Sequence, residues 1–179
     1  MFPADPLTAT FCAIDFETAD READSACQVG LCRVEGGAVV RTHAVLVRPP
    51  RQEFAFTHVH GLTWASVEKA EPFGPVWGGI GDLIASCAFL VAHNAPFDRR
   101  TLLACCRAAG LPAPDLPWVC TQSLARKRWP GERYGLGDVC GRLGIPLTHH
   151  EAGSDAEACA RVLLALAGEL AADGGRAVA

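Results

Sequence analysis

The chain has 179 residues, half of them hydrophobic, and a formal net charge of −4. This length supports one substantial hydrophobic core and does not require two, so we expect one domain. The charge excludes a generally basic surface, the simplest sign of nucleic-acid binding, although it does not exclude such binding. No segment approaches the roughly 20 apolar residues of a membrane span, and the N-terminal segment does not resemble a secretory signal. We therefore expect a soluble, cytoplasmic protein without a membrane partner.

The first half of the sequence predicts a three-stranded meander followed by two helices. An apolar run at 10–16 predicts the first strand. Two further strand-like runs, 27–34 and 38–47, are separated by a Glu-Gly-Gly turn signal and predict a hairpin. Helices are predicted at 63–70 and 76–86, the second from apolar residues at helical spacing.

The second half alternates strands with helices. Residues 88–92 form a continuous apolar run, typical of a buried strand, and lead into a helix that reaches Ala109, with Pro96 near its first turn. The last predicted helix opens with the capping-box pattern Ser154-x-x-Glu157. The remaining elements are a last strand at 118–120 and helices at 123–128, 136–143 and 154–171.

A meander followed by alternating strands and helices predicts an α/β fold with a mixed central sheet and helices on both faces. We expect a single domain over residues 8–172, flanked by flexible tails at 1–7 and 173–179. Nine cysteines, an odd number without a C-x-x-C pair, favour buried reduced thiols over disulfides or a zinc site.

Two carboxylates, Asp15 and Glu17, lie within the first predicted strand, in the stretch FCAIDFET. Side chains alternate along a strand, so both project from one face, where two like charges repel each other. A divalent cation is the simplest compensation, and an all-oxygen site suits Mg²⁺ or Mn²⁺. The alternative is that the strand has ended and both acids are solvated.

Two further carboxylates, Asp98 and Asp155, fall at the starts of predicted helices, where the helix dipole alone stabilises an acid. His150 stands five residues before Asp155, in a loop that can bring an imidazole over the same site. A histidine with a pKa near 6.5 removes a proton from water at neutral pH. Four acids and one base are typical of a two-metal hydrolase.

Three segments, FCAIDFETAD, VAHNAPFDRR and HHEAGSDAEACA, resemble in order the three motifs of the DEDDh (DnaQ-like) 3′-to-5′ exonucleases. This family includes RNase T, oligoribonuclease and the epsilon proofreading subunit of bacterial DNA polymerase III. The resemblance runs from about residue 10 to residue 171 and implies an RNase H-like fold. It also implies hydrolysis of single-stranded or frayed 3′ ends to 5′-mononucleotides.

Carried over by position, the resemblance assigns four carboxylates to a site for two divalent cations, Mg²⁺ or Mn²⁺, and His150 to the role of general base. His149 stands one residue too far from Asp155 and is expected to be a neighbour only. His93 is expected to hold the strand exit together. The four assigned ligands are Asp15, Glu17, Asp98 and Asp155.

The segment VHGLT resembles the H-G-I-T turn of the epsilon-like subgroup, in which the apolar residue borders the terminal bases. A plain glycine turn before a helix is the alternative, and it leaves His60 unexplained. The full set of residues that the resemblance places at the substrate is Phe16, Thr18, His60, Gly61, Leu62, Asn94 and Phe97.

The substrate class stays open between DNA, RNA and short oligonucleotides, because sugar discrimination depends on few contacts. The expected partners are single-stranded DNA or RNA 3′ ends, with the protein acting as a monomer, as a homodimer or attached to a DNA polymerase subunit. Alternatives to a proofreading exonuclease are an RNA-trimming exoribonuclease or oligoribonuclease-like enzyme, another hydrolase such as an endonuclease, and a non-catalytic module that binds nucleic acid or a polymerase. The basic run Arg126–Arg128 either contacts phosphates or is a solvated surface.

Overall fold

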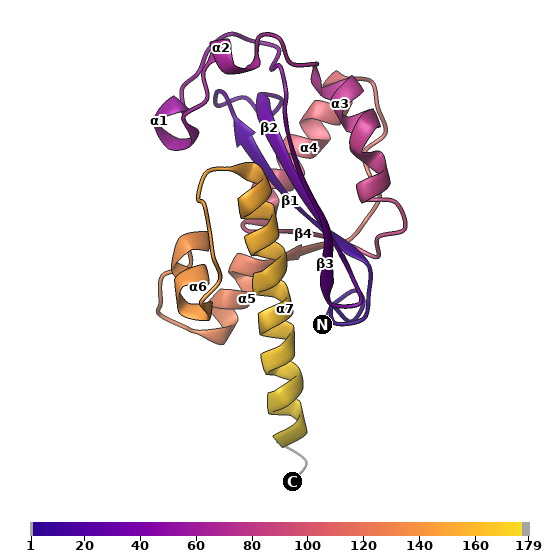
Figure 1. Cartoon of the computed structure of the whole chain (residues 1–179), viewed down its shortest axis with the longest axis vertical. Coiled ribbons are helices and arrows are strands. Elements are labelled where there is room, and N and C mark those ends of the chain that lie inside the picture. The colour runs from indigo at the N-terminus through magenta and orange to yellow at the C-terminus, as the bar shows by residue number, and fades with distance from the viewer. Residues whose placement is uncertain (1, 177–179) are drawn as a thin grey trace.

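The computed structural model describes residues 2–176 and contains one five-stranded sheet in the order β3-β2-β1-β4-β5 (Figure 1). Strands β1, β2 and β3 pair antiparallel, whereas β1, β4 and β5 pair parallel. The sheet is therefore mixed, which confirms the predicted α/β class. The strands are β1 Phe11–Thr18, β2 Ala26–Glu35, β3 Ala38–Leu46, β4 Leu90–Ala92 and β5 Trp118–Cys120.

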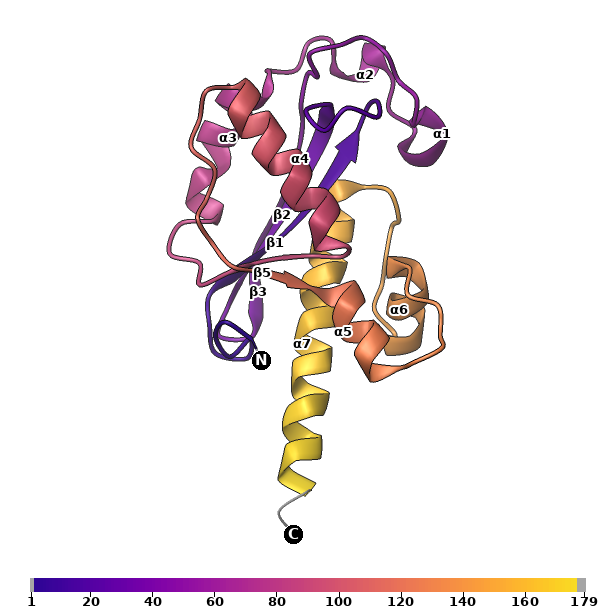
Figure 2. The same ribbon diagram turned by 180° about the vertical axis from the view of Figure 1, so that it is seen from behind.

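Helices cover both faces of the sheet, because successive side chains of β1 point to opposite sides. Ile14 and Phe16 pack with α3 and α4, whereas Phe11 and Ala13 pack with α7. Figure 1 shows α7 in front of the sheet, and Figure 2 shows α3 and α4 on the opposite face. The helices are α1 Thr57–His60, α2 Trp64–Val67, α3 Phe73–Ile80, the 3₁₀ turn η1 Gly81–Leu83, α4 Ala95–Ala108, α5 Thr121–Arg128, α6 Leu136–Leu143 and α7 Ala152–Arg176.

Several helix boundaries differ from those that the sequence predicts, most clearly those of α2 and α3. Helix α2 stops at Val67, since the chain must then turn towards Pro72, which bridges to Arg48 and disfavours a helical residue before it. Helix α3 begins earlier, at Phe73, and gives way to a 3₁₀ turn after Ile80, in a glycine-rich stretch of low helix propensity.

The capping box predicted for α7 is wrong. The helix begins at Ala152, so Ser154 lies inside its first turn, and the Ser154 hydroxyl accepts the Thr148 N–H at 2.8 Å. The carboxylate of Glu151 instead accepts the N–H groups of Gly153 and Ser154, at 3.2 and 2.8 Å. Glu151 therefore satisfies the helix N-terminus that the sequence analysis assigned to Ser154.

The two segments predicted as flexible tails are mostly described here. Phe2 and Ala4 pack against the core beneath α7, and Pro6 is buried. Helix α7 continues through Arg176, where a tail was expected from residue 173. Met1 and residues 177–179 lie outside the described residues.

The nine cysteines are free thiols, and all except the half-buried Cys120 are buried, as predicted. Burial raises the pKa of several of these thiols, that of Cys105 to about 11, which keeps them protonated and unreactive at neutral pH. Within residues 2–176 there is no helix with the length and apolarity that crossing a bilayer requires.

Candidate active site

The carboxyl end of β1 presents two acids towards α7. Asp15 and Glu17 share the face of Phe11 and Ala13, while the Phe16 side chain points to the other core and is 3% exposed. The Phe16 side chain is therefore packed inside the protein, and the substrate contact predicted for Phe16 stays a prediction for its backbone. Its backbone N–H has a separate role at the site.

Helix α7 brings a third acid to this end of β1. Oxygens of Asp15, Glu17 and Asp155 lie within 4.8 Å of one another. Glu17 and Asp155 are 8% and 4% exposed, and Asp15 is partly buried. Three carboxylates so close together repel one another strongly unless protons or a cation compensate their charge.

Asp98 stands beside these three acids, in the first turn of α4. It is 2% exposed, and its Oδ1 accepts the backbone N–H of Phe16 at 3.2 Å. Strand β4 pairs with β1 only at Cys12 and Ala13, so Asp98 satisfies an N–H for which β4 provides no partner. Burial raises the pKa of Asp98 well above its usual range, although backbone hydrogen bonds to the carboxylate act in the opposite direction.

The mutual repulsion of these acids shows in their pKa values. Burial, together with the charges of Asp98, Asp155 and Glu17, raises the pKa of Asp15 well above its usual range. Burial and the charges of Asp155 and Glu151 raise the pKa of Glu17 to about 7. Without a cation, the site therefore holds protons that ordinary carboxyl groups would have lost.

The two histidines before α7 lie over Asp155 as one stacked pair. The Nδ1 of His149 is 3.2 Å from Asp155 Oδ2, and the backbone N–H of His150 donates to the same oxygen at 3.1 Å. The two imidazole rings stack with their centroids 3.9 Å apart. Both histidines are exposed, and a ring nitrogen of each lies within 4.8 Å of an Asp155 oxygen. His150 has a left-handed backbone, φ 65°.

The turn at His60–Leu62 is fixed to the end of β1. The Nδ1 of His60 accepts the Leu62 N–H at 3.0 Å, so Nε2 carries the proton and donates to the Thr18 carbonyl at 3.1 Å. Gly61 has φ 75°, a conformation that favours glycine, and Leu62 is half-buried against a small apolar cluster. His60 therefore holds the turn in place, with both ring nitrogens engaged by the backbone.

The remaining predicted substrate residues lie at the rim of the site. Thr18 and Phe97 line a cavity of about 250 Å³ together with Arg100, and each is next in sequence to one of the acids. Asn94 is exposed, with φ 76°, directly before α4. His93 binds Thr121 Oγ1 and the Tyr134 carbonyl, at 2.9 and 2.8 Å, as expected of a residue that holds the strand exit together.

Sequence reasoning missed Glu151 and Gln28. The charge of Glu151 contributes to the raised pKa values of Asp15 and Glu17, so it belongs to the field of the site. Gln28 lies opposite Glu17 in the β1–β2 register. Neither stands in a position marked by a motif, although Glu151 directly follows the His149-His150 pair.

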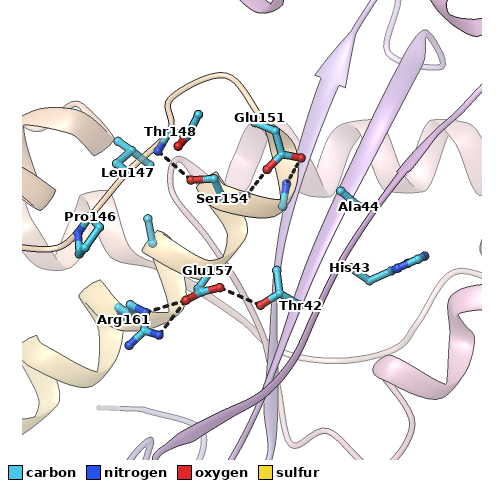
Figure 3. A pocket seen from close by; sticks show the side chains of 12 residues that line it. Thr42, His43, Ala44, Pro146, Leu147, Thr148, Glu151, Ser154, Glu157 and Arg161 are labelled. Atoms are coloured by element: carbon cyan, nitrogen blue, oxygen red, sulfur yellow. Dashed lines mark hydrogen bonds and ion pairs between the residues drawn. The ribbon is translucent and has the colours of Figure 1, made fainter.

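The donor set fits a hard divalent cation. The clustered ligand atoms are carboxylate oxygens, with imidazole nitrogens beside them, and buried oxygens whose charge is uncompensated attract such ions. Figure 3 shows Glu151 and Ser154 at the start of α7, where they border a groove next to β3. The residues that line this groove do not include Asp15, Glu17 or Asp155.

Comparison with known proteins identifies the family of the chain. A family model described as "Exonuclease" matches residues 12–163. The PolC-type DNA polymerase III of Thermotoga maritima is 31% identical over 161 residues, which cover 87% of this chain and 12% of that polymerase. The corresponding polymerase of Streptococcus pneumoniae serotype 4 is 32% identical over 168 residues, with 91% and 11% covered. This chain therefore spans only about one eighth of the length of these relatives.

Solved structures share the fold. Exonuclease X in complex with 5′ overhanging duplex DNA has a TM-score of 0.74 at 26% identity, covering 89% of this chain and 92% of that chain. The nuclease domain of 3′hExo, a DEDDh family member bound to rAMP, has a TM-score of 0.78 at 18% identity, covering 93% and 95%. The chain therefore shares the RNase H-like fold of these exonucleases. It belongs to the exonuclease family, whose members generally use divalent cations.

Proposed function

We propose that this protein removes 5′-mononucleotides from the 3′ ends of single-stranded or frayed nucleic acid. The observation that carries the proposal is the convergence of Asp15, Glu17 and Asp155 within 4.8 Å, where burial and the charges of neighbouring acids raise the pKa values of Asp15 and Glu17. Such a site binds an anionic phosphodiester only when cations accompany it. A structural role for these acids does not account for three of them on one face.

The four carboxylates Asp15, Glu17, Asp98 and Asp155 would hold two cations, Mg²⁺ or Mn²⁺. Such ions polarise the scissile phosphate and stabilise the leaving oxygen when bound. His150 accepts the proton of the attacking water, and its exposed position leaves room for that water. The contacts of Asp155 with His149 and with the His150 backbone keep the histidine loop over the site.

The residues around the clustered acids would supply the contacts to the substrate. The His60-anchored turn presents Gly61 and Leu62 beside the end of β1, where an apolar side chain packs on the terminal base. Figures 1 and 2 both show α1 above the loop that precedes α7, so the residues proposed to contact the substrate and His150 lie at the same end of the molecule. Thr18, Asn94 and Phe97 would contact the same nucleotide or its neighbour from the α4 side.

Proofreading beside a DNA polymerase is the setting that the PolC relatives favour, since the exonuclease-like segment there is part of a polymerase chain. RNA trimming is the second candidate, favoured by the structural likeness to a nuclease domain bound to rAMP. We place the protein in the cytoplasm, as a monomer or homodimer. A non-catalytic binding module is disfavoured, because all five positions of the family site are filled.

Matched DNA and RNA oligonucleotides with free or blocked 3′ ends test the proposal in Mg²⁺, in Mn²⁺ and in chelator. We expect metal-dependent shortening of the free ends, and the ratio of DNA to RNA rates then decides between the two settings. Equal cleavage of free and blocked ends would indicate an endonuclease, and no cleavage of any substrate would favour a binding module.

A further inference from the structure

The first turn of α7 lies directly on strand β2. A Cβ atom at Gly30 would stand 1.9 Å from the Ala152 carbonyl oxygen and 2.6 Å from the Gly153 nitrogen, whereas real Cβ contacts stay beyond 3.0 Å. Any other residue at this position therefore displaces the start of α7 by more than about 1 Å, or displaces β2. Glycine within a strand often marks such a close approach of two backbones.

Gln28, two residues earlier on the same face of β2, adds a directional contact. Its Oε1 accepts the N–H of Ala152 at 3.2 Å. The first N–H groups of a helix have no partner within the helix, so this bond fixes the helix start on the sheet. We call Gln28 and Gly30 together the β2 seat.

The β2 seat lies opposite the metal-site acids. In the β1–β2 register, Gly30 pairs with Asp15 and Gln28 pairs with Glu17. Directly opposed residues share one face of a sheet, so the seat and the two acids face α7 together. Asp155 follows Ala152 by three residues, within the same helical turn. The distance between the Ala152 backbone and the β2 seat therefore sets the distance between the Asp155 and Asp15 carboxylates.

The contacts of α7 with β3 are looser than those with the seat. Residues of β3, the loop at 146–148 and α7 line a groove of about 690 Å³. The Thr42 hydroxyl donates a hydrogen bond across it to Glu157 at 2.9 Å, marked by a dashed line in Figure 3. The seat is therefore the closest contact that locates the first turn of α7 on the sheet.

We propose that Gln28 and Gly30 are positioning residues that set the spacing of the carboxylate ligands, by fixing the first turn of α7 and thereby Asp155. This inference rests on the proposed function, because it assigns a role in the same metal site. Residues that orient metal ligands without touching the metal typically change metal affinity by roughly 10- to 100-fold when they are replaced.

The test titrates Mn²⁺ into folded wild-type and variant chains and measures its Kd directly, alongside kcat and KM for 3′-end hydrolysis. We expect Gly30→Ala to raise the Mn²⁺ Kd by at least about tenfold and to lower kcat. Gly78→Ala is the matched control, since Gly78 is exposed on α3, has no atom near its Cβ position, and should leave the Kd unchanged.

A second pair of variants keeps the inference testable if Gly30→Ala does not fold. Gln28→Met removes the acceptor oxygen for the Ala152 N–H at similar side-chain size and adds no charge beside Glu17. We expect a several-fold weaker Mn²⁺ affinity for Gln28→Met than for the wild type. Ala160→Val, in the buried face of α7 away from the seat, controls for general loosening of the helix and should lower the melting temperature without changing the Kd.

The outcomes separate this inference from the proposed function. If the wild type is active and the Gly30 and Gln28 variants keep its Mn²⁺ Kd within about twofold, the positioning role of the β2 seat is refuted. The proposed function then still stands. A wild type that neither binds Mn²⁺ nor hydrolyses 3′ ends would overturn both. A loss of metal affinity confined to the seat variants supports the inference.

Discussion

The stability of the metal-free protein should fall as pH rises from 5 to 8, and much of this fall should be traceable to Glu17. Its pKa is raised from 4.5 to about 7 by burial and by the charges of Asp155 and Glu151. Between these two values the folded state keeps a proton that the unfolded chain has released. Stability that is fully present below pH 4.5 is therefore lost progressively as pH rises through about 7.

The size of the stability loss follows from the pKa shift of Glu17. At about 1.4 kcal/mol per pKa unit, deprotonating the 8% exposed Glu17 in the folded state costs about 3 kcal/mol. For a chain of this size that corresponds to a fall of roughly 6 to 12 °C in Tm. The raised pKa of Asp15 acts in the same direction.

The assay compares free energies of unfolding for the wild type and Glu17→Gln, from urea titrations in chelator at pH 5 and pH 8. Contributions from other groups are largely shared by both proteins, including those of His60 and His93, whose pKa values are lowered by burial. We expect the wild type to lose about 3 kcal/mol more than Glu17→Gln, and Mn²⁺ at pH 8 to restore the loss. Equal pH dependence in the two proteins would refute the reasoning.

Three further predictions concern other residues of the site. Asp155→Asn should leave the stability in chelator unchanged or raise it, because the substitution relieves repulsion with Asp15 and Glu17. The activity of the folded variant should collapse, and melting curves measured together with hydrolysis rates check both outcomes. His150→Ala should lower the rate of 3′-end hydrolysis by a factor of roughly 10² to 10⁴, and His149→Ala should lower it by far less. The opposite order of effects would show that His149, which contacts Asp155, is the general base. His60→Ala should raise KM more than it lowers kcat in steady-state kinetics, because it frees the turn that holds Leu62.

The fold class could be predicted because the strands and helices differ in length and periodicity. The mixed sheet followed from the meander and the later alternation, and the boundaries of α6 were predicted without error. The start of α7 could not be predicted, because Glu151 and Ser154 both have oxygens that can accept the first N–H groups of a helix. Only the close approach of Ala152 to Gly30 determines which of the two residues precedes the helix. Local sequence does not encode that approach.

The site was predictable in its acids and less so in its supporting contacts. Alternation along β1 put Asp15 and Glu17 on one face, and the order of motifs supplied Asp155. Alternation also placed the Phe16 side chain on the opposite face, where it is buried. The contact of His60 with the Thr18 carbonyl spans 42 residues and has no signature in sequence.

The most direct measurement is a time course with a single-stranded oligonucleotide labelled at its 3′-terminal nucleotide. With Mg²⁺ or Mn²⁺ present, the first labelled product should be a 5′-mononucleotide, and chelator should abolish its release. Asp155→Asn, shown to be folded, should release none above background. A longer labelled fragment as the first product, or undiminished release after exhaustive chelation, would contradict metal-dependent 3′-to-5′ hydrolysis at this site.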